Sequence, residues 1–150
     1  MVDIQTVSVA AASASVTLAA IYYIWQIRHQ TKIRQTDLLV RVFSSMSSKD
    51  WMEAWEKVRD REFLNYDDYK KKYGFVEANQ IALFFEQVGM LLEKKLIDID
   101  LIPFRAGQVK GTYEKLKPLI EGSRSKFDEP ELMHGFEYLY NEVKKREQRQ

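Results

Sequence analysis

The sequence predicts an all-α protein with a single N-terminal transmembrane helix followed by a cytoplasmic bundle of about five helices. Three observations support this prediction. The segment 4–27 holds twenty-four residues without a charge, and about twenty apolar residues span the hydrocarbon core of a bilayer as a helix. Only 6 Gly and 3 Pro occur in 150 residues. After residue 27 the apolar residues recur at helical spacing and seldom alternate as they would in a strand.

The segment 1–28 is expected to be a membrane anchor. Its middle is rich in Ala and Ser, which insert less favourably than Leu, so three alternatives compete with a membrane span. A cleaved signal peptide has basic residues before its apolar core, whereas Asp3 stands there and no Lys or Arg does. A buried helix of a soluble protein would be shorter or amphipathic. A disordered Ala/Ser tail would not end in a cluster of aromatic residues.

The distribution of basic residues predicts the orientation of the anchor. All 23 Lys and Arg lie after residue 27, and basic flanks stay in the cytoplasm. We therefore expect a single-pass protein of the cell membrane, with its N-terminus outside and its C-terminal domain cytoplasmic.

Aromatic and basic residues gather where the predicted span meets the inner membrane surface. Aromatic rings are enriched at headgroup level, and each basic group near an anionic leaflet contributes roughly 1 kcal/mol. The basic residues could serve only to fix topology, which we favour over a specific lipid site. The candidate membrane-interface residues are Tyr22, Tyr23, Trp25, Arg28, Lys32 and Arg34.

Small residues recur at four-residue spacing in the span, as in Ser8 and Ala12. Such pairs allow close approach of helices in lipid, so the span is a candidate surface for homo-oligomerisation. An Ala-rich helix that packs on nothing would show the same spacing.

Two further segments complete the predicted organisation. The segment 29–47 is expected to form a juxtamembrane helix that can run on from the span, and 48–150 the cytoplasmic helical domain. Within that domain the first helix is predicted over 50–64, near a weak capping signal at Ser47. Trp51 and Trp55, four residues apart, are expected to pack in the core.

The middle of the domain is predicted to contain its central helix. A short helix should begin at Asp67 or Asp68 and end before Gly74 in the C′ position. The segment 75–96 is the most hydrophobic part of the domain and is expected to be a buried helix. Gly89 inside it costs about 1 kcal/mol relative to Ala, which predicts the close approach of another helix.

The last part of the chain is predicted to hold a short turn and two helices. The turn of helix follows Asp98, passes Pro103 and reaches Gly107. A helix from about 108 or 112 to 120 should be kinked or restarted by Pro118, with a loop at 122–125. The final helix is expected to open at Asp128, with Pro130 in its first turn, and to reach about residue 148.

The sequence holds no convincing catalytic or metal site. There is no Cys, which excludes thiolate chemistry and Cys-based metal sites. The histidines His29 and His134 have no partner at a metal-ligand spacing. Gly107 and Gly111 lack the fingerprint of a phosphate-binding loop. We therefore predict no catalytic residue, no metal and no cofactor.

Glu86, in the hydrophobic segment, is the one candidate for acid/base chemistry. A buried carboxylate can have a raised pKa suited to that role. The favoured interpretation is structural: Glu86 pairs with a Lys or Arg of a neighbouring helix, or faces solvent.

The balance of charge indicates which class of partner to expect. After residue 27 the chain has 23 basic and 21 acidic residues, the 22 acids less Asp3, a net charge of +2. A nucleic-acid binder would show a clear basic excess, so none is expected. Lys70, Lys71 and Lys72 are expected to be a solvated face; the alternative is that the fold brings them against the membrane beside the other basic residues.

The predicted function is that of a membrane-tethered, non-enzymatic helical module that binds or recruits a protein partner. The rivals are a membrane-bound enzyme with a site near Glu86, and a weak nucleic-acid or lipid-surface binder that uses the basic C-terminal stretch 144–149.

Four stretches of the domain carry a family resemblance. They are Phe84-Phe85-Glu86-Gln87-Val88-Gly89-Met90-Leu91, Leu96-Ile97-Asp98, Tyr113-Glu114-Lys115-Leu116-Lys117-Pro118-Leu119-Ile120 and Phe136-Glu137-Tyr138-Leu139. Over roughly residues 51–146 this pattern resembles an uncharacterised bacterial and archaeal family of unknown function, whose members have one N-terminal span and a small cytoplasmic helical domain. The resemblance implies the fold and the topology, and it assigns no catalytic residue.

Overall fold

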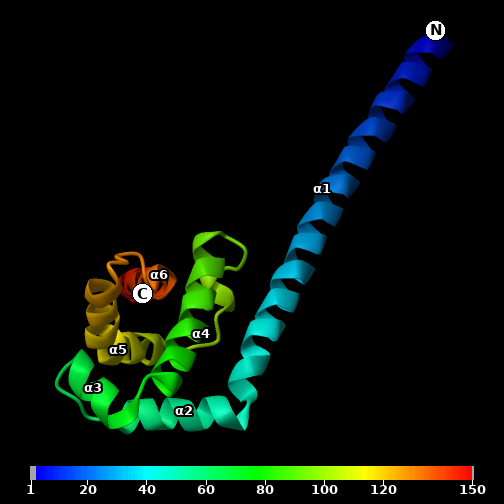
Figure 1. Ribbon diagram of the computed structural model, residues 1–150. Coiled ribbons are helices and arrows are strands. Elements are labelled where there is room, and N and C mark those ends of the chain that lie inside the picture. The colour runs from blue at the N-terminus through cyan, green and yellow to red at the C-terminus, as the bar shows by residue number, and fades with distance from the viewer. Residues whose placement is uncertain (1–2, 150) are drawn as a thin grey trace. The chain divides into compact units, whose positions relative to one another are not determined.

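The computed structural model describes residues 3–149, and within them every regular element is a helix (Figure 1). The prediction of an all-α fold is therefore confirmed. The α-helices are α1 (Ile4–Ser44), α2 (Lys49–Asp60), α3 (Tyr66–Tyr73), α4 (Val76–Glu93), α5 (Ala106–Phe127) and α6 (His134–Gln148), and two single 3-10 turns are η1 (Ser45–Ser47) and η2 (Ile99–Leu101). The contacts divide the chain into two compact units between Asp37 and Leu38.

Helix α1 is long and apolar enough to cross a membrane, and none of its apolar stretch is buried in the protein. It is one uninterrupted helix, so the predicted span and juxtamembrane helix are continuous. The hydroxyls of Ser13, Ser15 and Thr17 donate to backbone carbonyls four residues earlier, at 2.8–2.9 Å. These bonds satisfy the side-chain donors inside the helix, as a hydrocarbon environment requires.

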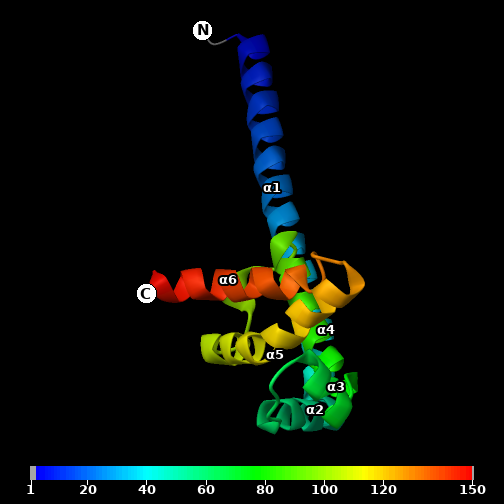
Figure 2. The ribbon, with the colours of Figure 1, turned by 60° about the vertical axis from the view of Figure 1, so that its left-hand side comes forward.

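Helix α4 is the centre of the second unit, as the sequence predicts. Ile81, Phe85 and Val88 on its inner face are at most 1% exposed. Helix α6 crosses α4 steeply (Figures 1 and 2), and the rings of Phe85 and Phe136 stack with centroids 4.8 Å apart. The close approach predicted at Gly89 is confirmed, because its backbone lies against that of Gly135 in α6.

The end of α1 and helix α2 close one side of this core. Phe43 lies 5.1 Å from Phe104 and 6.2 Å from Phe84 between ring centroids. Trp51 is buried and stacks on Trp55 at 5.9 Å, which confirms that this pair packs in the core.

The predicted limits of α2 and α3 need correction. Helix α2 ends at Asp60 and not at 64, and its N-cap is Ser48 and not Ser47; the Ser48 side chain accepts from the Trp51 N–H at 3.2 Å. The cap of α3 is Asn65, which accepts from the Asp68 N–H at 3.0 Å, instead of Asp67 or Asp68. The predicted end at Gly74 is confirmed, because its φ of 69° suits a glycine C-cap.

Helix α5 runs unbroken from Ala106 to Phe127, so the predicted restart at Pro118 and the loop at 122–125 were wrong. Pro118 lies on the exposed side of the helix, where only the N–H bond to the preceding turn is lost. Gly122 lies within the helix, and Tyr66 packs on it so closely that a Cβ there would lie 2.6 Å from the Tyr66 Cβ.

Helix α6 begins at His134, six residues after the predicted start at Asp128. Asp128 instead ends α5 in the left-handed conformation, with φ 54°. Pro130 therefore lies in the connecting turn and not in the first turn of α6.

Candidate functional site

A groove lies between α4 and α5 in the second unit. Its volume is about 310 Å³, and its floor is formed by apolar side chains of both helices. Tyr66, Phe75 and, from the α5–α6 connection, Leu132 and Met133 also line it. The floor residues are Ala78, Ala82, Leu83, Leu116, Leu119 and Ile120.

Two large apolar side chains of the groove remain half exposed. Leu83 of α4 is 50% exposed and Phe127 at the end of α5 is 60% exposed. Val76, seven residues before Leu83 on the same face of α4, is 78% exposed. Isolated exposed apolar residues are normal, but a group around an apolar hollow is typical of a binding surface.

The α5–α6 connection places acidic side chains beside the groove. Asp128, Glu129 and Glu131 are all exposed. A wider hollow of about 550 Å³ over this connection shares Leu83 and Glu129 with the groove, so the acidic and apolar surfaces are continuous.

A cation also lies beside a lining residue of the groove. The Lys126 Nζ lies 5.2 Å from the centre of the Tyr66 ring, a cation–π contact. The groove is therefore flanked by the carboxylates of the α5–α6 connection and by the ammonium of Lys126 beside Tyr66.

His134 links the acidic connection to α4. Its Nε2 lies 3.1 Å from Glu93 Oε1, and its Nδ1 lies 3.5 Å from Glu131 Oε2. The hydrogen bond to Glu93 raises the pKa of His134 above its ordinary value, and the charges of Glu93 and Glu131 act in the same direction. No group of three or more His, Cys, Asp and Glu in residues 3–149 is arranged to hold a metal ion.

The Glu86 side chain makes a contact that neither sequence-based interpretation predicted: it does not match the acid/base role or the pairing with a Lys or Arg. Its Oε2 accepts a hydrogen bond from the backbone N–H of Phe136 at 2.8 Å. Helix α6 has no side-chain cap from its own N-cap residue, Met133. Glu86 therefore supplies from α4 the carboxylate that caps the first turn of α6, where negative charge is favoured by the helix dipole.

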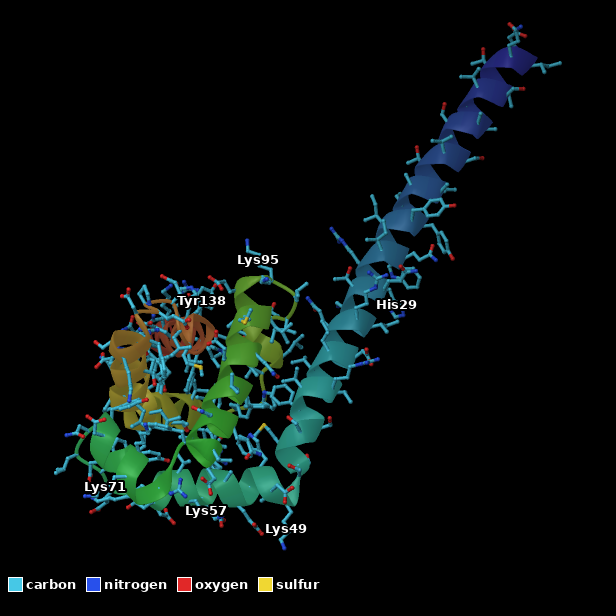
Figure 3. All side chains as sticks on the ribbon, viewed as in Figure 1. His29, Lys49, Lys57, Lys71, Lys95 and Tyr138 are labelled. Carbon is cyan, nitrogen blue, oxygen red and sulfur yellow. The ribbon has the colours of Figure 1, made fainter. Side chains whose placement is uncertain are left out.

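The candidate membrane-interface residues follow one another along α1. Tyr22 lies 6.1 Å from Tyr23 and 6.4 Å from Trp25 between ring centroids. Trp25 stacks on His29 at 5.5 Å with an interplanar angle of 3°, and Figure 3 shows His29 on the outside of the helix. Their position at a membrane surface stays a prediction.

The three basic candidates, Arg28, Lys32 and Arg34, are exposed on the turns of α1 that follow these aromatic residues. Figure 3 shows Lys49 of α2 and Lys71 of α3 at the edge of the second unit, whereas the Lys57 Nζ of α2 lies 3.6 Å from Glu77 Oε1 of α4.

The groove was not predicted from the sequence. Its walls come from α3, α4, α5 and the α5–α6 connection, which are far apart in the chain. The one available signal was that α4 is apolar on more than its core face: Val76 and Leu83, seven residues apart, form an outer stripe beside the buried one.

Comparison with known proteins identifies the family of this chain but assigns it no biochemical activity. Neither a curated protein nor a solved structure matches the chain. A family model described as a domain of unknown function, DUF4760, matches residues 9–143, which include most of α1 and nearly all of the second unit. The four sequence stretches that carry the resemblance all lie within this match, and the chain belongs to the DUF4760 family.

Proposed function

We propose that this protein is a membrane-tethered helical module whose cytoplasmic domain binds a protein partner in the groove between α4 and α5. The observation that carries the proposal is the groove itself, with Leu83 and Phe127 half exposed on an apolar floor. Burying these side chains against a partner would contribute about 25 cal/mol for each Å² of apolar surface removed from water.

The tether is proposed to be α1, inserted as a single span with its N-terminus outside. Its uncharged stretch is long enough to span a bilayer. The basic residues that follow it support a cytoplasmic second unit, with Tyr22, Tyr23 and Trp25 at the inner interface. Anchoring confines the domain to a surface and raises its effective concentration for partners on the same membrane.

The lipid bilayer is thus one partner, and a protein in the groove is the other. Small residues along α1 also support homo-oligomerisation through the span. The contact between Glu86 and the Phe136 N–H gives this carboxylate a structural role, which favours a binding function over catalysis at Glu86.

Site-specific photo-crosslinking of the full chain in native membranes tests the groove. A photoreactive amino acid replaces Leu83 in one variant and Met52 in the matched control. Leu83 and Met52 are 50% and 54% exposed, and only Leu83 lines the groove. Both probes therefore sample solvent equally, and a difference between them reports on the groove.

The expected result is a discrete crosslinked protein from position 83 and none, or a diffuse background, from position 52. Identical patterns from the two positions, or crosslinks to lipid alone from position 83, would overturn the proposal. A crosslink from position 83 to a second copy of this chain would identify a homomeric contact in place of a recruited partner.

A further inference from the structure

We infer that the groove between α4 and α5 takes a basic amphipathic helix of a partner protein. The inference rests on the proposed function and specifies its partner. An amphipathic helix docks by laying its apolar face, with residues at i, i+3, i+4 and i+7, into a hydrophobic groove. The charges beside the groove then decide which helices are accepted.

The shape of the groove fits the apolar side of a helix. On its floor, Ala78 and Ala82, one turn apart on α4, are small side chains that leave space beside Leu116 and Leu119 of α5. A volume of about 310 Å³ lies at the lower limit of ligand pockets. It admits the anchoring side chains of a docked helix, while the helix backbone stays outside the hollow.

The acidic side chains beside the groove set the sign of the partner's charge. Asp128, Glu129 and Glu131 are exposed there. Within the described part of the chain, Asp128 and Glu129 form no ion pair, and Glu131 meets only the exposed His134, at 3.5 Å. Three carboxylates are therefore available to basic side chains that flank the partner's apolar face.

The same charges argue against two other occupants. An anionic lipid headgroup or an acidic helix would face three carboxylates, and like charges at an interface are unfavourable. The Lys126 ammonium beside Tyr66 would repel basic side chains. The basic side chains of the docked helix should therefore lie over the carboxylates of the α5–α6 connection and not beside Tyr66.

Two synthetic amphipathic peptides test the inference directly. One is built from Leu and Lys and the other from Leu and Glu, with the same apolar face. Binding of each labelled peptide is measured by fluorescence anisotropy on the full chain in nanodiscs of zwitterionic lipid, with empty nanodiscs as the blank. We expect the Leu/Lys peptide to bind at least tenfold more tightly than the Leu/Glu peptide, and its affinity to fall with added salt.

The first variant removes the three charges without changing shape: Asp128→Asn, Glu129→Gln and Glu131→Gln together. Asn tolerates the left-handed backbone that Asp128 adopts, with φ 54°. Loss of three exposed ion pairs is expected to weaken binding of the Leu/Lys peptide about fivefold or more.

A matched variant changes net charge equally at residues that do not line the groove. Glu56→Gln, Glu62→Gln and Glu121→Gln together neutralise three exposed carboxylates that do not line it. This variant should bind the Leu/Lys peptide within twofold of the natural sequence. An equal loss in both triple variants would overturn the inference, because it would show general attraction to an acidic protein.

Leu83→Ser separates failure of this inference from failure of the proposed function. If both peptides bind equally well and both are lost in Leu83→Ser, the groove is a docking site and the charge assignment is wrong. If Leu83→Ser leaves binding of the Leu/Lys peptide unchanged, the groove is not its site, and both proposals fail. Self-association by analytical ultracentrifugation that Leu83→Ser abolishes would assign the groove to a second copy and overturn the inference.

Discussion

Gly89 of α4 and Gly135 of α6 meet backbone to backbone. A Cβ added to Gly89 would overlap the carbonyl group of Gly135, and a Cβ added to Gly135 would lie 2.6 Å from the Glu86 carbonyl oxygen. Helix α6 can therefore cross α4 closely enough for the Phe136 N–H to reach the Glu86 carboxylate at 2.8 Å. The two glycines set the distance between α4 and α6, which meet in the core through the stacked rings of Phe85 and Phe136.

Gly89→Ala is expected to destabilise the domain. The added methyl group meets backbone atoms, which cannot rotate away, and overpacking of this kind costs about 1–3 kcal/mol. The higher helix propensity of Ala offsets at most about 1 kcal/mol of that. Denaturant unfolding of the full chain in detergent, followed by circular dichroism, measures the net loss. An unchanged midpoint would show that α4 and α6 can separate without cost.

Gly107→Ala and Gly111→Ala should have the opposite effect. Both glycines lie inside α5, and a Cβ at either would meet nothing within 4 Å. Removing their excess backbone freedom should stabilise the domain by about 0.5–1 kcal/mol each. The same unfolding assay compares them with Gly89→Ala. A loss of stability at 107 or 111 would contradict this account of the open positions.

Glu86→Ala should cost about 1 kcal/mol of stability, since it removes the cap of α6 and leaves the Phe136 N–H without its partner. Glu86→Gln keeps an oxygen acceptor and should cost less. Unfolding midpoints of the two variants test this order. Equal losses would show that the charge of Glu86, and not its hydrogen bond, is what matters.

The sequence was informative where the cause of a structural feature is local. Gly74 ends α3 because a glycine readily adopts its φ of 69°. Helix α4 was recognised from its apolar residues, and the close approach at Gly89 from the cost of a glycine inside a helix. In each case the sequence signal lies within the helix itself or at its end.

The sequence misled where a distant residue decides the outcome. The start of α6 was expected at Asp128 from local capping signals, yet its cap is Glu86, 50 residues before Phe136. Gly122 was expected in a loop, but Tyr66 of α3 packs on it within α5. The groove has the same origin, because its walls meet only after α3, α4 and α5 have packed.

The stability of the domain should fall as the pH rises through the pKa of His134. The hydrogen bond to Glu93 raises this pKa in the folded state above its ordinary value of 6.5. A raised histidine pKa contributes stability that is fully present below the unfolded value and is lost above the folded one. The decrease is therefore expected from about pH 6.5 upward.

Glu93→Gln isolates this contribution. The difference in unfolding free energy between the natural sequence and the variant should shrink from acidic pH to pH above 6.5. Glu56→Gln, an exposed carboxylate on α2, serves as the control and should give a difference that does not follow His134. A difference that grows with pH would contradict the assigned sign.

Cysteine labelling can determine the topology of α1, because the sequence contains no Cys and a single introduced thiol is unique. A membrane-impermeant maleimide applied to intact cells should label Asp3→Cys. It should label Ser125→Cys, an exposed position on α5, only after the membrane is permeabilised. Replacing Arg28, Lys32 and Arg34 with Gln should weaken this preference, since basic flanks hold their side of a span in the cytoplasm. If Ser125→Cys is labelled in intact cells while Arg28, Lys32 and Arg34 are unchanged, the groove lies outside the cell, and a cytoplasmic partner is excluded.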